Sequence, residues 1–453
     1  MFQNVHKIWL LLGTGAAVAL VLSACAVSGL PAAKSPLLHV LAPSSGRVAY
    51  IGTDGNVHIA FPTGKVINIT TDGQAGPHPA VTYTTPEWSF NGKELAYARI
   101  RRATSKSGLR SEIFVTNAAG RLTHEVYATA TLLPFYLYWS PNNSSIAVLS
   151  AAVGNGSSLR FGIVDAKVDG KGGGALKANY TPVGSGSPFY WAWAPNGSMV
   201  VAHTQERASP GAKDFIAFYN LASAGRAPRA RKDFRGALGA FDAPAVSPDG
   251  RSVLVPIGNP RRSNLVLWSL RSGRKVSIAT VTGRVSYSFS PNGRYVAFVD
   301  ASSSSGRPTL HVVELRNPQA GYTLKGRPVV AFWWAPNSSE IAYVTPANVG
   351  PGSLDPLFAR TGNLAIASMN VLDVRNRRSR SVADYPLTAS FLANVPFNDQ
   401  YQLSSTIWSP NSTHLLFTAI SRTGNPGIFV AAANGGLQPS LLAYGGFASW
   451  SWR

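Results

Sequence analysis

A short turn motif recurs eight times along the chain and constrains its fold more than any other feature. In its clearest copy, Phe289 to Phe298 read FSPNGRYVAF: an aromatic residue, a Ser-Pro-Asn-Gly turn and an apolar run. Pro presets φ at the first turn position, and Asn and Gly accept the positive φ that such a turn needs. The Ser or Ala before each turn lies at Ala42, Ser89, Ser140, Ala194, Ser247, Ser290, Ala335 and Ser409.

These copies lie 43 to 54 residues apart, except for the last spacing of 74 residues. In each unit an aromatic strand, such as Phe189 to Trp193, precedes the turn and a β-branched run follows it. A third strand, such as Asn264 to Trp268, and a fourth, such as Lys275 to Ala279, complete the unit. A period of this length with four antiparallel strands is typical of a propeller blade. One blade cannot bury its own faces, so we expect the array to close.

The two ends of the chain predict how the ring closes. No aromatic strand precedes Pro43, whereas Trp450 to Trp452 near the C-terminus repeat the pattern of Trp191 to Trp193. We therefore expect the C-terminal strand to join the N-terminal blade and remove the open sheet edges. The 74-residue unit is interpreted as one blade with two insertions, at 345–362 and 385–404.

The predicted fold is therefore all-β: a single β-propeller of four-stranded antiparallel blades, eight in number, with seven as the alternative. No window of the sequence has an amphipathic helical period. The motif [WF]-[SA]-P-[ND]-G-[KR]-x-[IV]-A-[YF] resembles the TolB-type, WD-like propeller repeat of bacterial periplasmic and surface proteins, over roughly residues 42–453. This resemblance implies the fold and carries no functional residues, because its hallmark positions are turn and core positions. The small α/β domain that precedes the TolB propeller has no counterpart here, so TolB's partners are not transferred.

The N-terminal segment predicts export. Lys7 supplies a positive charge, Ile8 to Leu22 form a 15-residue apolar run, and Leu22-Ser23-Ala24-Cys25 follows. The last four residues resemble a bacterial lipobox, in which Cys25 is diacylated through its thiol and begins the mature protein. An ordinary signal peptide or a membrane-spanning anchor is the alternative, although the run is short for a span.

The predicted organisation is a lipoprotein signal peptide at 1–24, an acylated tether at 25–38 and the propeller at 39–453. Cys25 is the single cysteine, so no intrachain disulfide is expected. The resemblance to a lipobox implies a location at the bacterial cell envelope, periplasmic or extracellular. The lipid would lie on the outer side of the cytoplasmic membrane or in the outer membrane.

A search for catalytic and metal-binding motifs predicts no catalytic residue, no metal ligand and no cofactor. No G-x-S-x-G nucleophile elbow occurs, and the nearest string, Gly184 to Pro188, is expected to be a loop. The eight histidines are scattered without an H-E-x-x-H spacing. Asp165 to Gly170 loosely resembles a calcium loop but lacks the later acidic ligands.

Charge is the unusual bulk property, with 41 Lys and Arg against 20 Asp and Glu and a net charge of +21. In a four-stranded blade, the turns between the first and second strands share one face of the disc with those between the third and fourth. Several of these turns are basic. The residues predicted to attract an anionic surface are Arg229, Arg231, Arg271, Arg274, Lys275, Arg375, Arg377, Arg378 and Arg380. The opposite face is predicted to be basic too, but Glu206, Asp214 and Asp355 dilute it; its basic residues are Arg99, Arg101, Arg102, Lys106, Arg110, Arg261 and Arg262.

Two interpretations of the charge are open: simple solubility, and attraction to anionic headgroups or cell-wall polymers. The export signal disfavours nucleic acid as a partner. The function expected from these features is a binding or assembly scaffold, rather than an enzyme, at the bacterial cell envelope. Its partners would be the membrane, through the lipid on Cys25, and an envelope protein or anionic polymer.

The alternative is a propeller enzyme, such as a lyase, lactonase or glycoside hydrolase, with its site at the central channel. Propellers host both classes, so the fold alone does not decide between them. A channel mouth lined by metal ligands or carboxylates would favour the enzyme. An apolar or merely basic channel would favour the scaffold.

Overall fold

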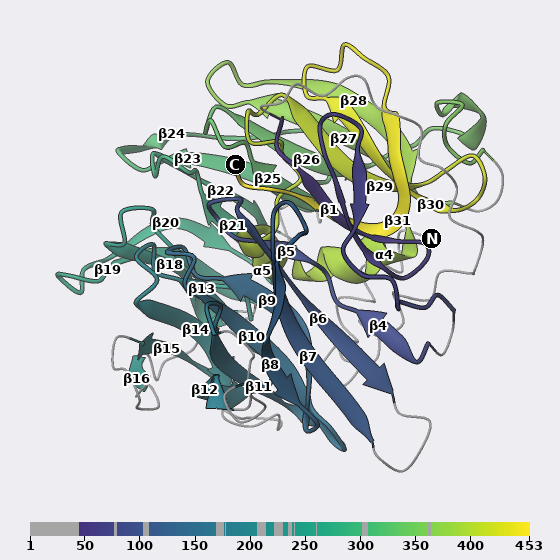
Figure 1. Ribbon diagram of the computed structural model, residues 1–453. Helices are drawn as coiled ribbons and strands as arrows, with labels where there is room; N and C mark the ends of the chain where they lie inside the picture. The colour runs from purple at the N-terminus through teal and green to yellow at the C-terminus, as the bar shows by residue number, and fades with distance from the viewer. Residues whose placement is uncertain are drawn as a thin grey trace.

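The computed structural model describes residues 45–76, 79–102, 108–168, 176, 178–205, 214–221, 230–233, 238–239, 241–259, 261–300, 307–360 and 364–453. Their strands form seven antiparallel sheets that pack around a centre in which the short helix α5 lies (Figure 1). The predicted signal peptide, the tether with Cys25, and Arg229 lie outside the described residues.

Six of the sheets each come from one continuous part of the chain. Five of these have four strands: β9 to β12 (Leu132–Trp139, Ser145–Ala152, Asn155–Asp165, Tyr180–Gly186), β13 to β16 (Phe189–Trp193, Met199–Gln205, Asp214–Asn220, Ala230–Asp233), β17 to β20 (Ala245–Val246, Ser252–Asn259, Arg262–Ser269, Lys275–Val281), β21 to β24 (Val285–Phe289, Tyr295–Asp300, Thr309–Glu314, Asn317–Thr323) and β25 to β28 (Ala331–Trp334, Glu340–Pro346, Ile366–Asp373, Arg378–Pro386). The sixth contains β4 (Val81–Tyr83), β6 (Glu94–Arg102), β7 (Leu109–Asn117) and β8 (Thr123–Thr129), with β5 (Glu87–Trp88) also paired to β6.

The seventh sheet joins the two ends of the chain. Its strands, in spatial order, are β29 (His414–Ile420), β30 (Pro426–Ala432), β31 (Ser440–Trp450), β1 (Val48–Gly52), β2 (Val57–Ala60) and β3 (Val66–Asn68). The first half of β31 pairs with β30, and its second half pairs with β1, with Trp450 opposite Val48. The predicted closure by the C-terminal strand is confirmed. The last and first repeats share β31, so the eight sequence repeats form seven sheets. With each sheet counted as one blade, the seven-bladed alternative is confirmed.

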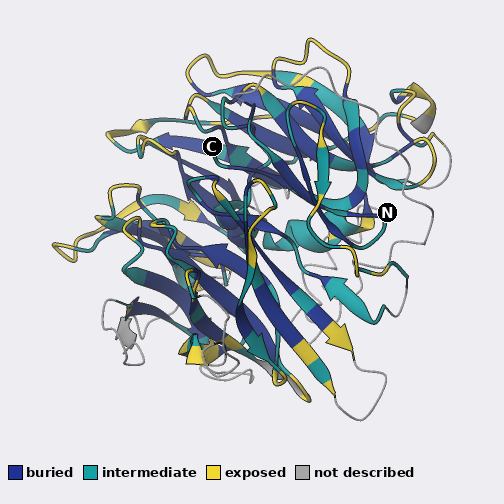
Figure 2. Cartoon of the chain, viewed as in Figure 1, coloured by how far each residue is buried: buried dark blue, intermediate teal, exposed yellow. Residues whose placement is uncertain are grey.

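The core lies between neighbouring sheets, which explains why the central strands are apolar on both faces. All five residues of β13 are buried, as are Val200 to Thr204 of β14, whereas the outer strand β20 begins with three exposed residues. Figure 2 shows the same gradient from buried inner strands to exposed turns. One hydrophobic cluster joins Phe161 to Trp191 across the boundary between two sheets.

The aromatic residue before each turn fastens one blade to the next. Trp88, Trp139 and Trp408 hold this position and are among the largest fully buried side chains, and Trp193 at the same position is 4% exposed. The indole Nε1 of Trp139 donates to the carbonyl of Glu87 at 2.9 Å, and that of Trp408 donates to the carbonyl of Trp333 at 3.1 Å. Each of these bonds reaches the innermost strand of the preceding blade.

The turns themselves also link neighbouring blades. Gly293 takes φ 67°, the positive value that the turn needs. In three copies a side-chain residue occupies this position with φ near 60°: Asn143, Ser338 and Ser412. The oxygen of each accepts a backbone N–H from the turn of the preceding blade, as when Asn292 donates to the Ser338 Oγ at 3.0 Å. This contact offsets the strain of a positive φ in a residue with a Cβ.

Both predicted insertions are present around the sheet β25 to β28. The first, between β26 and β27, contains a 3-10 turn, η2 (Pro351–Ser353). The second follows β28 and folds into α4 (Ala389–Asn394), η3 (Val395–Phe397) and α5 (Asn398–Ser404). These short helices were not predicted, because no window of the sequence has an amphipathic helical period.

Candidate functional site in the central channel

Helix α5 lies among the innermost strands of the propeller and contacts β9, β13, β21 and β25 (Figure 1). Its residues Asn398, Asp399, Gln400 and Ser404 are buried although all four are polar. Buried polar groups need hydrogen-bond partners. Those partners show how α5 is held among the inner strands.

Gln400 binds the inner edge of a blade as a neighbouring strand would. Its side-chain Oε1 accepts the backbone N–H of Trp191 at 2.8 Å, and its Nε2 donates to the Trp191 carbonyl at 2.9 Å. The hydroxyl of Tyr136 donates to the backbone carbonyl of Gln400 at 3.0 Å. An inner strand has no further neighbour in its sheet, so these amide bonds satisfy groups that would otherwise need water.

Two neighbouring residues of α5 bind other blades in the same way. The Nδ2 of Asn398 donates to the carbonyl of Phe332 at 3.4 Å. The Oδ2 of Asp399 accepts the backbone N–H of Ala243 at 2.8 Å. Three consecutive side chains of α5 thus hold backbone groups of β13, of β25 and of the segment just before β17.

One half-buried arginine, with 24% of its side chain exposed, lies between two buried carboxyl groups. The Nε of Arg284 is 3.4 Å from the Oδ1 of Asp242, and its Nη2 is 3.2 Å from the Oδ1 of Asp399. The guanidinium also lies 5.7 Å from the ring centroid of Tyr190. Burial raises the pKa of Asp242 well above its usual range and also raises the pKa of Asp399, while the charge of Arg284 opposes both shifts. The cluster ties α5 to two blades.

A third carboxyl group faces the same helix. Glu87 is 1% exposed, and the hydroxyl of Ser404 lies 3.5 Å from its Oε1. Its Oε2 has no hydrogen-bond partner among the described residues. Burial raises the pKa of this carboxyl group well above its ordinary value, so the neutral acid is favoured.

The channel therefore contains carboxyl groups, which the sequence analysis associated with an enzyme. Asp242 and Asp399 are bound to Arg284 and to backbone N–H groups, and Glu87 packs against α5. Within the described ranges, no group of three or more His, Cys, Asp and Glu side chains could hold a metal ion. Among the described residues, these carboxyl groups hold α5 in place through Arg284, Ser404 and backbone N–H groups.

The predicted basic residues lie where the topology puts them, at the turns between third and fourth strands. Arg271, Arg274 and Lys275 are exposed, as are Arg375, Arg377 and Arg378. Arg231 lies on β16 opposite Phe218. The turns between first and second strands adjoin them, because Leu270 donates its N–H to the carbonyl of Arg251 at 2.8 Å and Leu315 to that of Arg294 at 3.0 Å. We call this set of turns the basic turn face.

Not all of these side chains are available to a partner. The Nη2 of Arg380 is 2.5 Å from the Oε1 of Glu340, and its Nε donates to the carbonyl of Ala433. The guanidinium of Arg377 lies 4.9 Å from the ring of Tyr322, and the Lys275 ammonium lies 4.9 Å from the ring of Trp268. Arg380 is therefore a structural residue that joins neighbouring blades.

The opposite face differs in its charge balance. Three of its predicted basic residues converge on one buried carboxylate, because Arg99, Arg101 and Arg110 each approach Glu112 to 2.7 Å. Hydrogen bonds from these arginines lower the pKa of Glu112 although burial opposes them. Arg261 and Arg262, also on this face, are exposed.

The channel helix was not predicted from the sequence, and neither were its partners. The only signal was the spacing of 74 residues between Ala335 and Ser409, which placed an insertion at 385–404. Among the residues described, none of the helices has the length and apolar composition needed to cross a bilayer.

No family model matches the sequence, and no curated protein matches it either. Several solved structures do. One of two prolyl endopeptidases described in a structural and mechanistic analysis has a TM-score of 0.51 at 10% identity, with 99% of this chain and 54% of that chain covered. A structure described as the eukaryotic initiation factor has a TM-score of 0.50 at 16% identity, covering 94% and 91%.

TolB-type propellers are also among the similar structures. A putative TolB from Agrobacterium tumefaciens has a TM-score of 0.38 at 15% identity, with 71% of this chain and 98% of that chain covered. At these identities the comparisons show the β-propeller fold alone.

Proposed function

We propose that this protein is a lipid-anchored binding or assembly scaffold at the bacterial cell envelope. The observation that carries the proposal is the occupied channel. A propeller enzyme of the alternative class would need an accessible site there, whereas α5 fills the space with side chains bonded to the inner strands. Binding would then use the outer faces of the disc.

The lipobox and the basic turn face support the envelope location together. A single acyl signal often gives marginal membrane binding, and a basic surface supplies a second attraction of about 1 kcal/mol for each well-placed Lys or Arg. Arg375 and Arg378 are exposed at one turn of the basic turn face, and Arg271 and Arg274 at another. A lipid on Cys25 would keep this face close to an anionic membrane or wall polymer.

The test is binding of the mature chain carrying Cys25→Ser to vesicles, with neutral or anionic headgroups, at low and high salt. Arg375→Ser/Arg378→Ser should weaken binding to anionic vesicles by roughly thirtyfold at low salt, since two arginines contribute about 2 kcal/mol. The effect should fade at about 1 M salt, where the Debye length is about 3 Å.

The matched control is Arg261→Ser/Arg262→Ser, which removes the same charge from the opposite face. It should leave binding nearly unchanged. Equal losses in the two variants would show that only net charge matters. Equal binding to neutral and anionic vesicles would show that the charge is a solvated surface.

A further inference from the structure

A groove of about 680 Å³ lies between the first insertion and the last repeat of the propeller. One wall comes from the part of the insertion that follows η2, and the other comes from the end of β29 and the turn between β29 and β30. Both segments connect the second and third strands of their repeats, as do Arg261 and Arg262. The groove therefore belongs to the face opposite to the basic turn face.

Backbone hydrogen bonds fix the two walls of the groove relative to each other. The N–H of Ala359 donates to the carbonyl of Ile420 at 3.0 Å. The N–H of Arg422 donates to the carbonyl of Leu357 at 2.7 Å. Arg360 directly follows Ala359, so this pairing sets the backbone positions of both arginines that line the groove.

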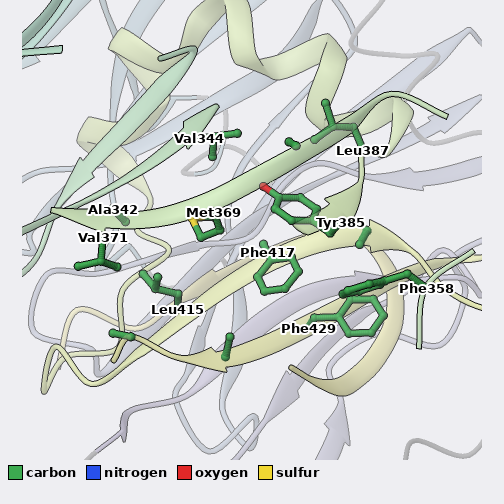
Figure 3. Close-up of a cluster of buried hydrophobic side chains, with 14 of the residues drawn as sticks. Ala342, Val344, Phe358, Met369, Val371, Tyr385, Leu387, Leu415, Phe417 and Phe429 are labelled. Atoms are coloured by element: carbon green, nitrogen blue, oxygen red, sulfur yellow. The ribbon is translucent and has the colours of Figure 1, made fainter. Parts of the chain in front are cut away.

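A buried aromatic side chain anchors the wall formed by the insertion. Phe358 is 1% exposed, and its ring centroid lies 4.8 Å from that of Phe429 and 6.3 Å from that of Phe417. Figure 3 shows Phe358 beside Phe429 in the hydrophobic cluster of the last repeat. The insertion is thus held by the core, and the groove is formed before any ligand arrives.

The groove has two positive charges and, among the described residues that line it, no negative charge. Arg360 and Arg422 are both exposed. The Nη2 of Arg360 donates to the carbonyl of Leu354 at 2.5 Å, and no ion pair within the described ranges reaches either guanidinium. The nearest acid along the chain, Asp355, accepts the N–H of Leu357 at 2.9 Å and is not part of the wall. Two guanidinium groups without a counter-ion in one groove attract an anion.

The remaining wall is largely apolar. It includes Pro356 and the half-buried Leu364 and Ile420. An inorganic anion would leave this surface in water, whereas an apolar group attached to the anion would cover it. Sites for small molecules have volumes of about 300–1,000 Å³ and combine apolar walls with a few polar groups. Guanidinium groups bind carboxylates and phosphates through paired hydrogen bonds.

From this geometry we infer that the groove binds a small organic oxyanion, a carboxylate or phosphate attached to an apolar group such as an aromatic ring. The oxyanion would accept hydrogen bonds from Arg360 and Arg422, and the apolar group would lie against Leu364 and Ile420. The site does not depend on the proposed scaffold function, because neither the lipid on Cys25 nor the basic turn face contributes to it.

The test is fluorine NMR titration of the mature chain carrying Cys25→Ser, at low salt, with four probes. The ring-bearing anions are 4-fluorophenylacetate and 4-fluorobenzyl phosphate. The neutral 4-fluorophenylacetamide has nearly the shape of the first, and trifluoroacetate has the charge without the ring. We expect a ring-bearing anion to bind saturably and roughly tenfold more tightly than the amide, about the gain from one charge-assisted hydrogen bond. It should also bind more tightly than trifluoroacetate, and the tighter of the two ring-bearing anions identifies the head group.

Arg422→Gln is the cleanest variant, because the Arg422 side chain has no hydrogen bond or ion pair among the described residues. It should keep the wild-type melting temperature and lose most of the preference for the anion over the amide. The matched control is Arg261→Gln, which removes one exposed charge from another turn of the same face and should keep the preference. No saturable binding of either ring-bearing anion, equally tight binding of the amide or of trifluoroacetate, or the same loss in Arg261→Gln would overturn the inference.

Discussion

Removing the C-terminal clasp should destabilise the propeller strongly. Deleting Phe447–Arg453 removes the half of β31 that pairs with β1 and leaves the inner edge of that blade open. The deletion also removes Trp450, which is 1% exposed, and the bond from the Ser451 N–H to the carbonyl of Arg47 at 2.7 Å. We expect the truncated protein to aggregate or to melt far below the wild type.

The point variant Trp450→Ala gives the magnitude. The indole Nε1 of Trp450 has no hydrogen-bond partner among the described residues, so the variant removes packing alone. Truncation of a buried aromatic side chain to Ala costs about 3–5 kcal/mol. Unfolding entropy is about 2.1 cal/mol/K per residue, which for about 410 residues predicts a melting temperature lower by about 4–6 °C.

The assay is urea unfolding followed by tryptophan fluorescence, with thermal melts in parallel. Trp452→Ala is the matched control, because Trp452 is only half-buried and its ring centroid lies 5.2 Å from that of Phe90. It should lose clearly less stability than Trp450→Ala. A truncated protein with the wild-type melting temperature, or equal losses in the two tryptophan variants, would refute closure through β31.

Three further predictions concern the channel and the anchor. Gln400→Ala should cost about 2–6 kcal/mol of unfolding free energy, because the N–H and the C=O of Trp191 each lose a partner. Gln402→Ala should cost much less, because the Gln402 Nε2 lies 3.4 Å from the Ser286 Oγ and makes only a long hydrogen bond. The urea midpoints of the two variants measure both costs. The pKa of Glu87 in the folded protein lies above its unfolded value near 4.5, so its contribution to stability is full below that pH and is lost as the pH rises. The unfolding free energy from urea titrations should therefore fall between about pH 5 and pH 8, and Glu87→Gln should remove this fall. An unchanged pH dependence in the variant would contradict the prediction. Cys25→Ala should abolish incorporation of a clickable fatty acid and leave the precursor uncleaved, and persistent label would sink the lipobox assignment.

The fold was predictable because its determinants are local. Each turn motif specifies its own φ values, and the strands beside it are short and apolar. The copied Trp450–Trp452 pattern even revealed the closing strand. The number of sheets was harder to predict, because a single continuous β31 merges two repeats and only its pairing on both sides shows this.

The channel site was hidden because its contacts join distant residues. Gln400 and Trp191 are 209 positions apart, and Asp399 and Arg284 are 115 apart. Helix α5 is surrounded by inner strands and buries Asn398, Asp399 and Gln400, so it has no apolar stripe for a periodicity search to detect. Arg380 was grouped with the exposed arginines for the same reason, since Glu340 lies on another strand.

The central claim is that α5 occupies the channel in the folded protein, and hydrogen exchange of the Trp191 amide tests it most directly. This amide donates to the side-chain Oε1 of Gln400 at 2.8 Å. We predict that it exchanges as slowly as the amides of β14 and loses protection in Gln400→Ala while β14 keeps it. Exchange within seconds in the folded wild type would mean that α5 leaves the channel, as the enzyme alternative requires, and would contradict the account.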